Sequence, residues 1–402
     1  MAAMSLRGAL TWRYRRVVNA LPRPARFALD GAEAAALGSP NLIRHLDLTA
    51  GIVRRRLWPQ RLFVGWLLHG DENDGAARVH ALLPHAFLRG RGVNSILLRK
   101  PCQIWAPYRI RAEDIDRVVR AGFDAVVFQG VYGPDAEALA LALKGTSTKT
   151  VYVAGDLVKQ GMPPVVDWVV VASDGLKGIA PGHFEKTSVI ASVIDAPTRL
   201  VKDYSRPPER DEIRVVWVGY PENLHLLAPV REALKDPRLT RFRLITITRG
   251  PGATIQWDRK RVWRHLLACD VAVLPSAQTD WYQAKPNTRM TMLKSLGLPI
   301  VASPIPSYRE TLSHGASCFF ARTAAEWADC LAALADFTCR RRIGLADRQR
   351  ILATYGIQAV GGQWLSLFEQ LAGPRRAPRA QPCRRPEAGA LDGLGRPASG
   401  GG

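Results

Sequence analysis

One stretch of the chain collects polar and cationic side chains at a spacing that could bind an anion. Residues 285–308 read KPNTRMTMLKSLGLPIVASPIPSY, and Lys285, Asn287 and Arg289 stand at the start of a short predicted helix. The free N–H groups and the positive dipole end of a helix N-terminus favour an anion. Lys285 and Arg289 are four residues apart, so on one helical face both could reach it. The stretch therefore predicts a phosphate site.

Buried strands must position this stretch. The turn Gly297-Leu298-Pro299 leads into the apolar run 300–302, which suits a buried parallel strand. The same alternation of strand, turn and helix occurs in two series along the chain. We expect strands at 62–68, 94–98, 125–128, 150–154, 168–172 and 187–190, and again at 214–218, 243–247, 270–274 and 300–302. We expect helices at 76–88, 224–234, 263–267, 324–336, 340–354 and 357–371.

Two series of strands in 402 residues indicate two domains, since a single core seldom grows that large. The predicted fold class is α/β, with two tandem Rossmann-like domains and a ligand cleft between them. We expect a basic N-terminal extension at 1–60, a first domain at 61–200, a second domain at 201–372 and a disordered tail at 373–402. A linker rich in proline and charge occupies 196–211.

The net charge of +21 is concentrated at the two ends, because residues 1–60 contribute +7 and residues 373–402 contribute +4. Basic ends attract nucleic acid or an anionic membrane surface. The body lacks the patterns of RNA- or DNA-binding modules, so no nucleic acid partner is expected. The N-terminal region is then either a partly ordered extension or an interfacial helix in peripheral contact with a membrane.

The expected location is the cytoplasm or the inner face of the membrane. No run of about 20 apolar residues is present, and the N-terminus lacks the features of a secretory signal. Six scattered cysteines without a C-x-x-C pair argue against a zinc site or a disulfide framework, so we expect no metal. We also expect no cofactor.

Further candidate site residues follow the predicted strands, at the edge of a parallel sheet where ligands bind. They are Gly219 and Asn223 in the second series, and His69, Asp71 and Asp156 in the first. Each also has a structural interpretation: a turn glycine, a helix cap, an exposed loop histidine or a turn-forming aspartate. Ser307 and Tyr308 flank the turn after 300–302 and could line the same cleft.

Several enzyme classes are not supported. The chain has no G-x-S-x-G elbow, no Walker loop and no H-E-x-x-H, which argues against serine hydrolases, P-loop NTPases and zincins. Neither first-strand loop carries G-x-G-x-x-G, so a dinucleotide-dependent oxidoreductase is not favoured.

The order of these segments resembles the nucleotide-sugar glycosyltransferases of the GT-B architecture. More narrowly, it is similar to the glycogen-synthase-like retaining branch, which includes many bacterial transferases of polysaccharide and cell-surface synthesis. The resemblance covers roughly residues 61–371. It rests on WVG at 217–219, CDVAVLP at 269–275, GLPIVAS at 297–303 and SYRE at 307–310.

The resemblance implies an enzyme that moves a sugar from a nucleoside diphosphate donor to a glycan or lipid-linked acceptor. The second domain would bind the donor, and basic side chains with a helix N-terminus would stabilise the leaving diphosphate without a metal. The implied donor-binding residues are Gly219, Asn223, Lys285, Asn287, Arg289, Ser307 and Tyr308. The candidates for acceptor or catalytic contacts are His69, Asp71 and Asp156.

The chain departs from this branch at one motif. Relatives commonly carry two glutamates eight residues apart, the second five positions before the glycine of Gly-x-Pro. Counting back from Gly297 places Met292 and Ala284 at these positions. Two alternatives therefore stay open beside the enzyme: a catalytically silent, transferase-like binding protein, and a scaffold that associates with membrane or nucleic acid.

Overall fold

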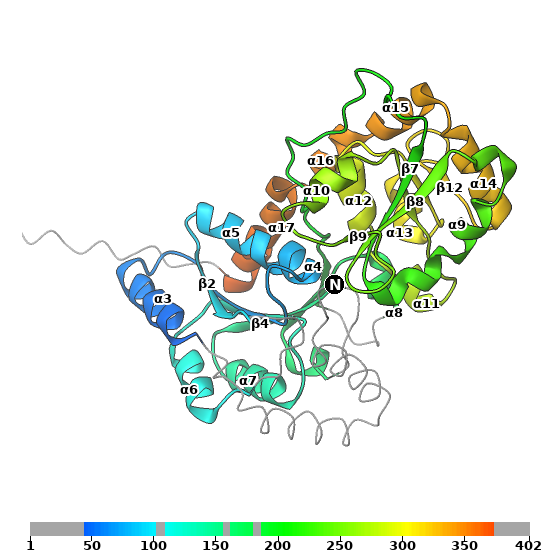
Figure 1. Ribbon diagram of the computed structural model, residues 1–402. Coiled ribbons are helices and arrows are strands. Elements are labelled where there is room, and N and C mark those ends of the chain that lie inside the picture. Colours follow the sequence, from blue (N-terminus) through cyan, green and yellow to red (C-terminus); the bar gives the residue numbers. More distant parts are fainter. Residues whose placement is uncertain (1–43, 102–108, 156–160, 180–185, 374–402) are drawn as a thin grey trace, which may run out of the picture.

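The computed structural model describes residues 44–101, 109–155, 161–179 and 186–373. These residues form two α/β domains, each built on a six-stranded sheet whose strands pair in parallel (Figure 1). Helices cover both faces of each sheet, so the strands are buried on both sides and consist of nearly continuous apolar runs. The predicted fold class of two tandem Rossmann-like domains is confirmed.

The first sheet has the order β2-β1-β3-β4-β5-β6. Its strands are β1 (Phe63–Leu68), β2 (Asn94–Arg99), β3 (Ala125–Gln129), β4 (Lys149–Ala154), β5 (Trp168–Val171) and β6 (Thr187–Val189). The helices are α3 (His45–Leu57), α4 (Gly75–Ala77), the π-helical turn η1 (Arg78–Leu82), α5 (Leu83–Gly90), α6 (Ala112–Arg120), α7 (Pro134–Lys144), the 3₁₀ turn η2 (Pro163–Val165) and α8 (Asp174–Ile179).

The second sheet has the order β12-β11-β10-β7-β8-β9. Its strands are β7 (Ile213–Val218), β8 (Phe242–Thr248), β9 (Ile255–Gln256), β10 (Val271–Leu274), β11 (Ile300–Ala302) and β12 (Phe319–Phe320). Its helices are η3 (Pro221–Leu227), α9 (Ala228–Ala233), η4 (Pro237–Leu239), α10 (Val262–Leu267), α11 (Asp280–Gln283), α12 (Thr288–Ser295), α13 (Pro306–Thr311), α14 (Ala324–Ala333), α15 (Phe337–Leu345), α16 (Arg348–Tyr355) and α17 (Ile357–Ala372).

The last helix returns to the first domain. Trp364 and Phe368 of α17 lie against Trp66 of β1, with ring centroids 5.4 and 5.8 Å from the Trp66 ring. Figure 1 shows α17 running from α16, at the edge of the second domain, to a position beside α5 of the first domain. The sequence range 201–372 therefore contains a helix whose packing belongs to the first domain.

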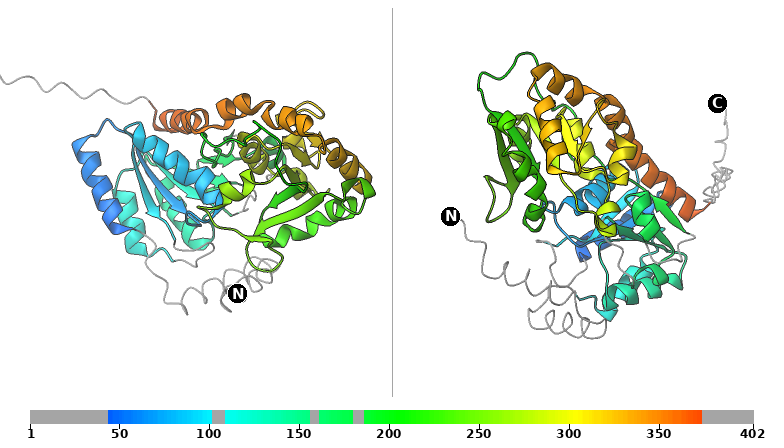
Figure 2. Two further views of the ribbon diagram at one scale, coloured as in Figure 1. Left: turned by 45° about the horizontal axis from the view of Figure 1, so that its top comes forward. Right: turned by 90° about the vertical axis from the view of Figure 1, so that its right-hand side faces the viewer.

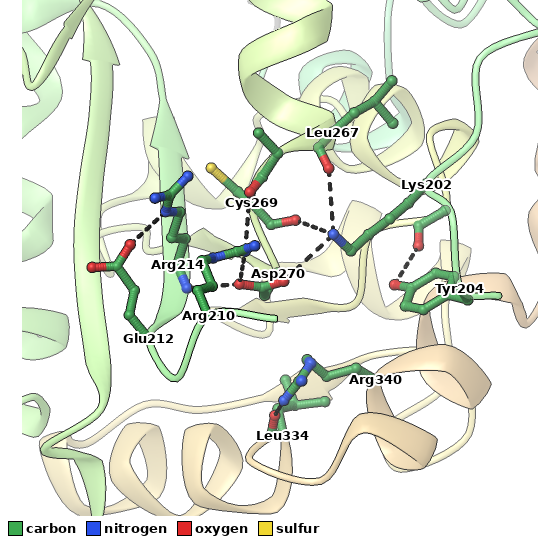
Figure 3. Close-up of polar contacts among 12 residues, drawn as sticks. Lys202, Tyr204, Arg210, Glu212, Arg214, Leu267, Cys269, Asp270, Leu334 and Arg340 are labelled. Atoms are coloured by element: carbon green, nitrogen blue, oxygen red, sulfur yellow. Dashed lines mark hydrogen bonds and ion pairs between the residues drawn. The ribbon is translucent and has the colours of Figure 1, made fainter. Parts of the chain in front are cut away.

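The linker at 196–211 is anchored to the second domain by a buried ionic cluster (Figure 3). Lys202 Nζ lies 3.5 Å from Asp270 Oδ1 and donates to the carbonyl of Cys269, and Arg210 pairs with Asp270 Oδ2 at 2.5 Å. Tyr204 donates to the carbonyl of Gly297. Burial lowers the pKa of the Lys202 ammonium. The negative charge of Asp270 partly offsets this lowering. The linker is therefore held against the second domain at Lys202, Tyr204 and Arg210.

All predicted strands are present, and two helical predictions need correction. Residues 45–57, predicted to be part of a partly ordered basic N-terminal extension, form the helix α3, which buries Leu48 and Gly51. The single helix expected at 340–354 is two helices, because Asp347 between α15 and α16 adopts a left-handed conformation with φ of 58°. Helical periodicity does not register such an interruption. In the described part of the chain, no helix is both long and apolar enough to cross a membrane.

Candidate functional site between the domains

The strand orders place two loops at equivalent positions. In the first sheet the order reverses between β1 and β3, and in the second between β7 and β10. Ligands of open α/β sheets bind at such switch points, beyond the carboxyl ends of the strands. The loop 69–74 follows β1 and Gly219 follows β7. The phenol of Tyr220 donates to Asp74 at 3.2 Å, so the two loops meet across the domain boundary.

Arg289 lies at the centre of the second-domain side. It is in the first turn of α12, and its guanidinium donates to the carbonyl of Val218 at the end of β7, at 3.4 Å. The guanidinium also hydrogen bonds with the buried Tyr308 phenol; burial raises the pKa of Tyr308 and Arg289 acts the other way. Arg289 is thus fixed by two elements while its side chain stays partly exposed.

Gly219 has a packing role that the sequence did not suggest. A Cβ on Gly219 would lie 2.6 Å from the buried Trp217 ring and 3.2 Å from Arg289 Nη1. The sequence suggested that glycine is needed here because a ligand approaches the backbone closely. The structure gives a second reason, because a side chain at position 219 would push against the Trp217 ring or the Arg289 guanidinium.

The premise that Lys285 and Arg289 share a helical face is wrong. α12 begins at Thr288, and Lys285 lies in the turn after α11. Pro286 explains this, because a proline disfavours helical geometry at the preceding residue. The Lys285 ammonium lies over the Trp281 and Tyr282 rings, 3.8 and 4.6 Å from their centroids, which is a cation–π geometry. A donor-binding role for Lys285 stays a prediction.

Asn287 and Ser307 hold the loop that carries Lys285. Asn287 occupies the N-cap position of α12, yet its side chain makes no cap bond and donates instead to Thr311 in α13, at 2.7 Å. Ser307 donates to the carbonyl of Lys285, also at 2.7 Å. Both side chains are buried. The structure therefore uses them to join α12 and α13.

Asn223 lies in η3 and connects the β7 loop to α11. Its amide oxygen accepts from the Tyr282 phenol at 3.1 Å. It does not occupy the N-cap of η3, which is Tyr220. With Tyr282 it forms one wall beside Arg289, whose charge acts on Tyr282: burial raises the pKa of Tyr282, and Arg289 opposes that shift.

In the first-domain loop, Asp74 rather than Asp71 is the organising carboxylate. The Asp71 carboxylate accepts hydrogen bonds from the backbone N–H and the side-chain amide of Asn73. Asp74 accepts from the N–H groups of Ala76 and Ala77, and lies 3.2 Å from Nε2 of His69. With the Tyr220 contact, the Asp74 carboxylate is fully occupied. The sequence carries a signal for this role: Asp74 is an acidic residue directly before Gly75, where α4 begins, and aspartate is a preferred N-cap residue.

Arginines and a tryptophan extend this boundary. The Arg249 guanidinium lies 4.5 Å from the centroid of the Trp257 ring and donates to the carbonyl of Asn73. Arg78, in the π-turn η1, lies 5.7 Å from the same ring and pairs with Asp195 at 2.6 Å. These residues were missed from the sequence, because no motif links positions 78, 249 and 257.

A hydroxyl chain joins the two domains below the N-terminus of α12. Ser192 lies 2.7 Å from the hydroxyl of Thr288, the first residue of α12, and 3.3 Å from Nε2 of His80. Burial lowers the pKa of His80 to about 4, so the imidazole is neutral near pH 7. The first turn of α12 therefore faces the first domain.

Ala284, where the sequence resemblance leads one to expect a glutamate, lies in a tight contact between the domains. Ala284 is buried with the core of the first domain, and its carbonyl accepts from Ser173 at 2.9 Å. A Cβ on Gly175 would lie 3.0 Å from the Ala284 Cα. Met292, at the second position, packs half-buried against the second-domain core. Ala284 is therefore in tight contact with the first domain, whereas Met292 is in contact with the core of the second.

Asp156, the third residue predicted for catalysis, lies outside the described residues. Among the residues that are described, no group of three or more His, Cys, Asp or Glu side chains is arranged to hold a metal ion. A cationic, partly aromatic boundary thus lies between the switch points of two Rossmann-like domains.

No protein-family profile and no curated protein matches this sequence. Solved structures do match in fold. Anabaena HepE, solved with UDP-glucose, superposes with a TM-score of 0.57 at 14% identity over 76% of this chain and 98% of HepE. Sucrose-phosphate synthase from Thermosynechococcus elongatus matches at 0.56 and 13%, over 77% and 98% of the two chains.

The chain has the GT-B fold. A glycosyltransferase from Rickettsia africae matches as well, with a TM-score of 0.53 and 11% identity over 77% of this chain and 98% of its own length. At these identities the likeness concerns the fold, and the GT-B expectation from the sequence is confirmed at that level.

Proposed function

We propose that this GT-B protein is a glycosyltransferase that moves a sugar from a nucleoside diphosphate donor to a glycan or lipid-linked acceptor. One observation carries the proposal: Arg289 is fixed between Val218 and Tyr308 at the switch point of the second sheet. A partly exposed guanidinium there suits a diphosphate, which it can bind with charge-assisted hydrogen bonds.

The proposed chemistry is stabilisation of the leaving diphosphate. As the bond between the sugar and the diphosphate breaks, negative charge grows on the phosphate oxygens. Arg289, the first turn of α12 and the nearby Lys285 would stabilise this charge with fixed groups, without a required metal. The fixed position of Arg289 matters because a preorganised cation needs no reorientation during the reaction.

The acceptor is proposed to enter from the first domain. The loop 69–74 closes on the second domain through Asp74–Tyr220 and Arg249–Asn73. Since Asp74 is occupied by four donors or partners, we assign it and His69 to closing and shaping the cleft. Action in cell-surface polysaccharide synthesis, at the cytoplasmic face of a membrane that the basic N-terminus contacts, completes the proposal.

A second candidate is a donor-binding protein without transferase activity. The packing of Ala284 against Gly175 favours it, because that packing removes the place where relatives carry their first glutamate. The two candidates share donor binding and differ in turnover.

Turnover of nucleotide sugars separates the candidates. The full chain is incubated with UDP-, GDP- and ADP-sugars, with and without glycan and lipid extracts, and release of the nucleoside diphosphate is measured. The enzyme predicts release with at least one donor, strongly reduced in Arg289→Met. Arg243→Met is the matched control, because Arg243 is exposed and its guanidinium donates to the carbonyls of Thr240 and Phe242. These lie at the N-terminal end of β8, opposite the carboxyl ends of the strands.

Thermal stabilisation by nucleoside diphosphates without turnover would support the silent binding protein. Absence of both turnover and stabilisation would contradict both candidates.

A further inference from the structure

The outward face of α3 carries a row of apolar side chains. Leu46, Ala50, Val53 and Leu57 are spaced at i, i+4, i+7 and i+11, so they lie on one side of the helix. The exposed fractions are 87% for Leu46, 49% for Val53 and 63% for Leu57, and Trp58 directly after the helix is 39% exposed. The opposite side of α3 buries Leu48 and Gly51 against the first sheet. Among the residues that the structure describes, the outward row therefore has no apolar side chain packed on it.

Exposed large apolar side chains are concentrated at this row. In the described part of the chain eight large apolar side chains are exposed, and four of them are Leu46, Val53, Leu57 and Trp58. The other four lie on separate elements. Single exposed apolar residues need no explanation, whereas a contiguous group marks an interaction surface. Figures 1 and 2 show α3 at the outer end of the first domain, away from the second domain and the cleft.

The C-terminal half of this surface is cationic. Between positions 44 and 61 there are five arginines and one acidic residue, Asp47. Arg55 pairs with Asp124, but Arg54 donates to the neutral amide of Asn94, and the guanidinium of Arg61 lies 5.0 Å from the centroid of the Trp58 ring. Arg56 is exposed. The charge near Trp58 is therefore not neutralised.

Besides Asp124, which pairs with Arg55, acidic groups lie at the other end of the helix. Asp114 of α6 contacts His45 at 3.4 Å, beside the start of α3, and Glu113 and Asp116 lie on the same short helix. The apolar side chains of Val53, Leu57 and Trp58 together with Arg56 and Arg61 thus form one cationic, apolar surface, which we call the α3 face.

We propose that the α3 face docks on an anionic lipid bilayer. Charge argues against three other occupants: the N-terminal segment, the C-terminal segment and a second copy of this chain. Residues 1–43 and 374–402 each carry six arginines against two acidic residues, so either segment would be repelled. A second copy would bring the same cations to the contact. An anionic bilayer accepts both components: arginines at the headgroups, with Trp and Leu side chains in the interfacial layer.

This proposal does not depend on transferase activity, and it differs from contact through the N-terminal residues because it concerns a folded helix. An acidic protein is the competing class of partner. Such a partner would account for the cations, but it leaves open why the apolar residues form a row flanked by a Trp–Arg pair, an arrangement typical of membrane interfaces.

Flotation of the full chain with vesicles tests the proposal. Vesicles of 30% phosphatidylglycerol in phosphatidylcholine are compared with pure phosphatidylcholine, in order to separate charge from apolar insertion. We expect binding to the anionic vesicles, reduced about tenfold in Leu57→Gln by the lost apolar contact and about fivefold in Arg56→Gln. Leu141→Gln is the control, because Leu141 is 54% exposed on α7 of the same domain.

Brominated lipids locate the contact. We expect bilayer-dependent quenching of tryptophan fluorescence in the wild type and its loss in Trp58→Phe, which distinguishes the α3 face from contact through residues 1–43. Thermal unfolding checks that the variants fold. Equal flotation of wild type and Leu57→Gln, or quenching unchanged in Trp58→Phe, would overturn the proposal. Absence of binding to both vesicles would also overturn it and leave an acidic protein as the partner class.

Discussion

Replacing Ala284 by glutamate, the residue that the sequence resemblance leads one to expect at this position, should destabilise the protein. Ala284 is 4% exposed, and its carbonyl accepts from Ser173 at 2.9 Å. Gly175 approaches so closely that a Cβ there would be 3.0 Å from the Ala284 Cα. A glutamate side chain at this boundary has no space, and its carboxylate has no cationic partner in these contacts.

The expected magnitude follows from two costs. Overpacking of a tight contact costs about 1–3 kcal/mol, and a buried carboxylate without a partner costs about 1–3 kcal/mol more. The combined loss of roughly 2–6 kcal/mol corresponds to a fall of roughly 4–24 °C in the melting temperature of a protein with domains of this size. Ala284→Ser, which adds only a hydroxyl, should cost much less.

The pH dependence gives a second test. Burial would raise the pKa of the new carboxyl above its unfolded value. The protonated form would then be favoured in the folded state, so stability is best preserved below the unfolded pKa and is lost as pH rises through the folded pKa. Calorimetry at pH 5 and pH 8 should show the larger deficit at pH 8. A melting temperature within about 2 °C of wild type at pH 8 would refute the packing argument.

Three further predictions concern the boundary between the domains. Gly219→Ala should weaken binding of nucleoside diphosphates about tenfold, since a Cβ would press on Arg289 Nη1 at 3.2 Å; unchanged affinity by titration calorimetry would argue against it. Burial lowers the pKa of His80 to about 4 in the folded protein. The unfolded chain therefore binds this proton at higher pH, and the free energy of unfolding should fall as pH drops from 6.5 towards 4. His80→Gln should remove up to roughly 3 kcal/mol of that dependence in denaturant titrations at pH 7 and pH 4.5, and an unaltered slope would contradict it. Asp74→Asn should lower stability by about 1–2 kcal/mol through the cap of α4, whereas Asp71→Asn should cost less; equal losses in thermal unfolding would speak against the distinction.

Much of the fold was predictable because local patterns dominate it. The strands of both sheets are buried on both faces, so each is a nearly continuous apolar run that periodicity detects directly. The limits were also local. Pro286 signals that Lys285 cannot share a helix with Arg289, and the cap position of Asp74 is readable from the Asp-Gly pair. Both signals are in the sequence and were given too little weight.

Other features arise from contacts between residues far apart in the chain. The return of α17 to Trp66 depends on where the chain crosses between domains, which no pattern within 357–372 specifies. The pairing of Arg249 with Trp257 and Asn73, and the packing of Ala284 on Gly175, depend on how the two sheets face each other. That Ala284 and Met292 stand where the resemblance leads one to expect glutamates can be read from the sequence, whereas the contact of Ala284 with Gly175 and Ser173 required the structure.

The central claim is that Arg289 binds a diphosphate at the switch point of the second sheet. Titration calorimetry of UDP, GDP and ADP into wild type, Arg289→Met and Arg243→Met tests it most directly. We predict binding of at least one nucleotide, weakened by roughly 10–100-fold in Arg289→Met, as expected for lost charge-assisted hydrogen bonds worth about 1.5–3 kcal/mol. Arg243→Met should bind as wild type does. Equal affinity of Arg289→Met and wild type would contradict the account.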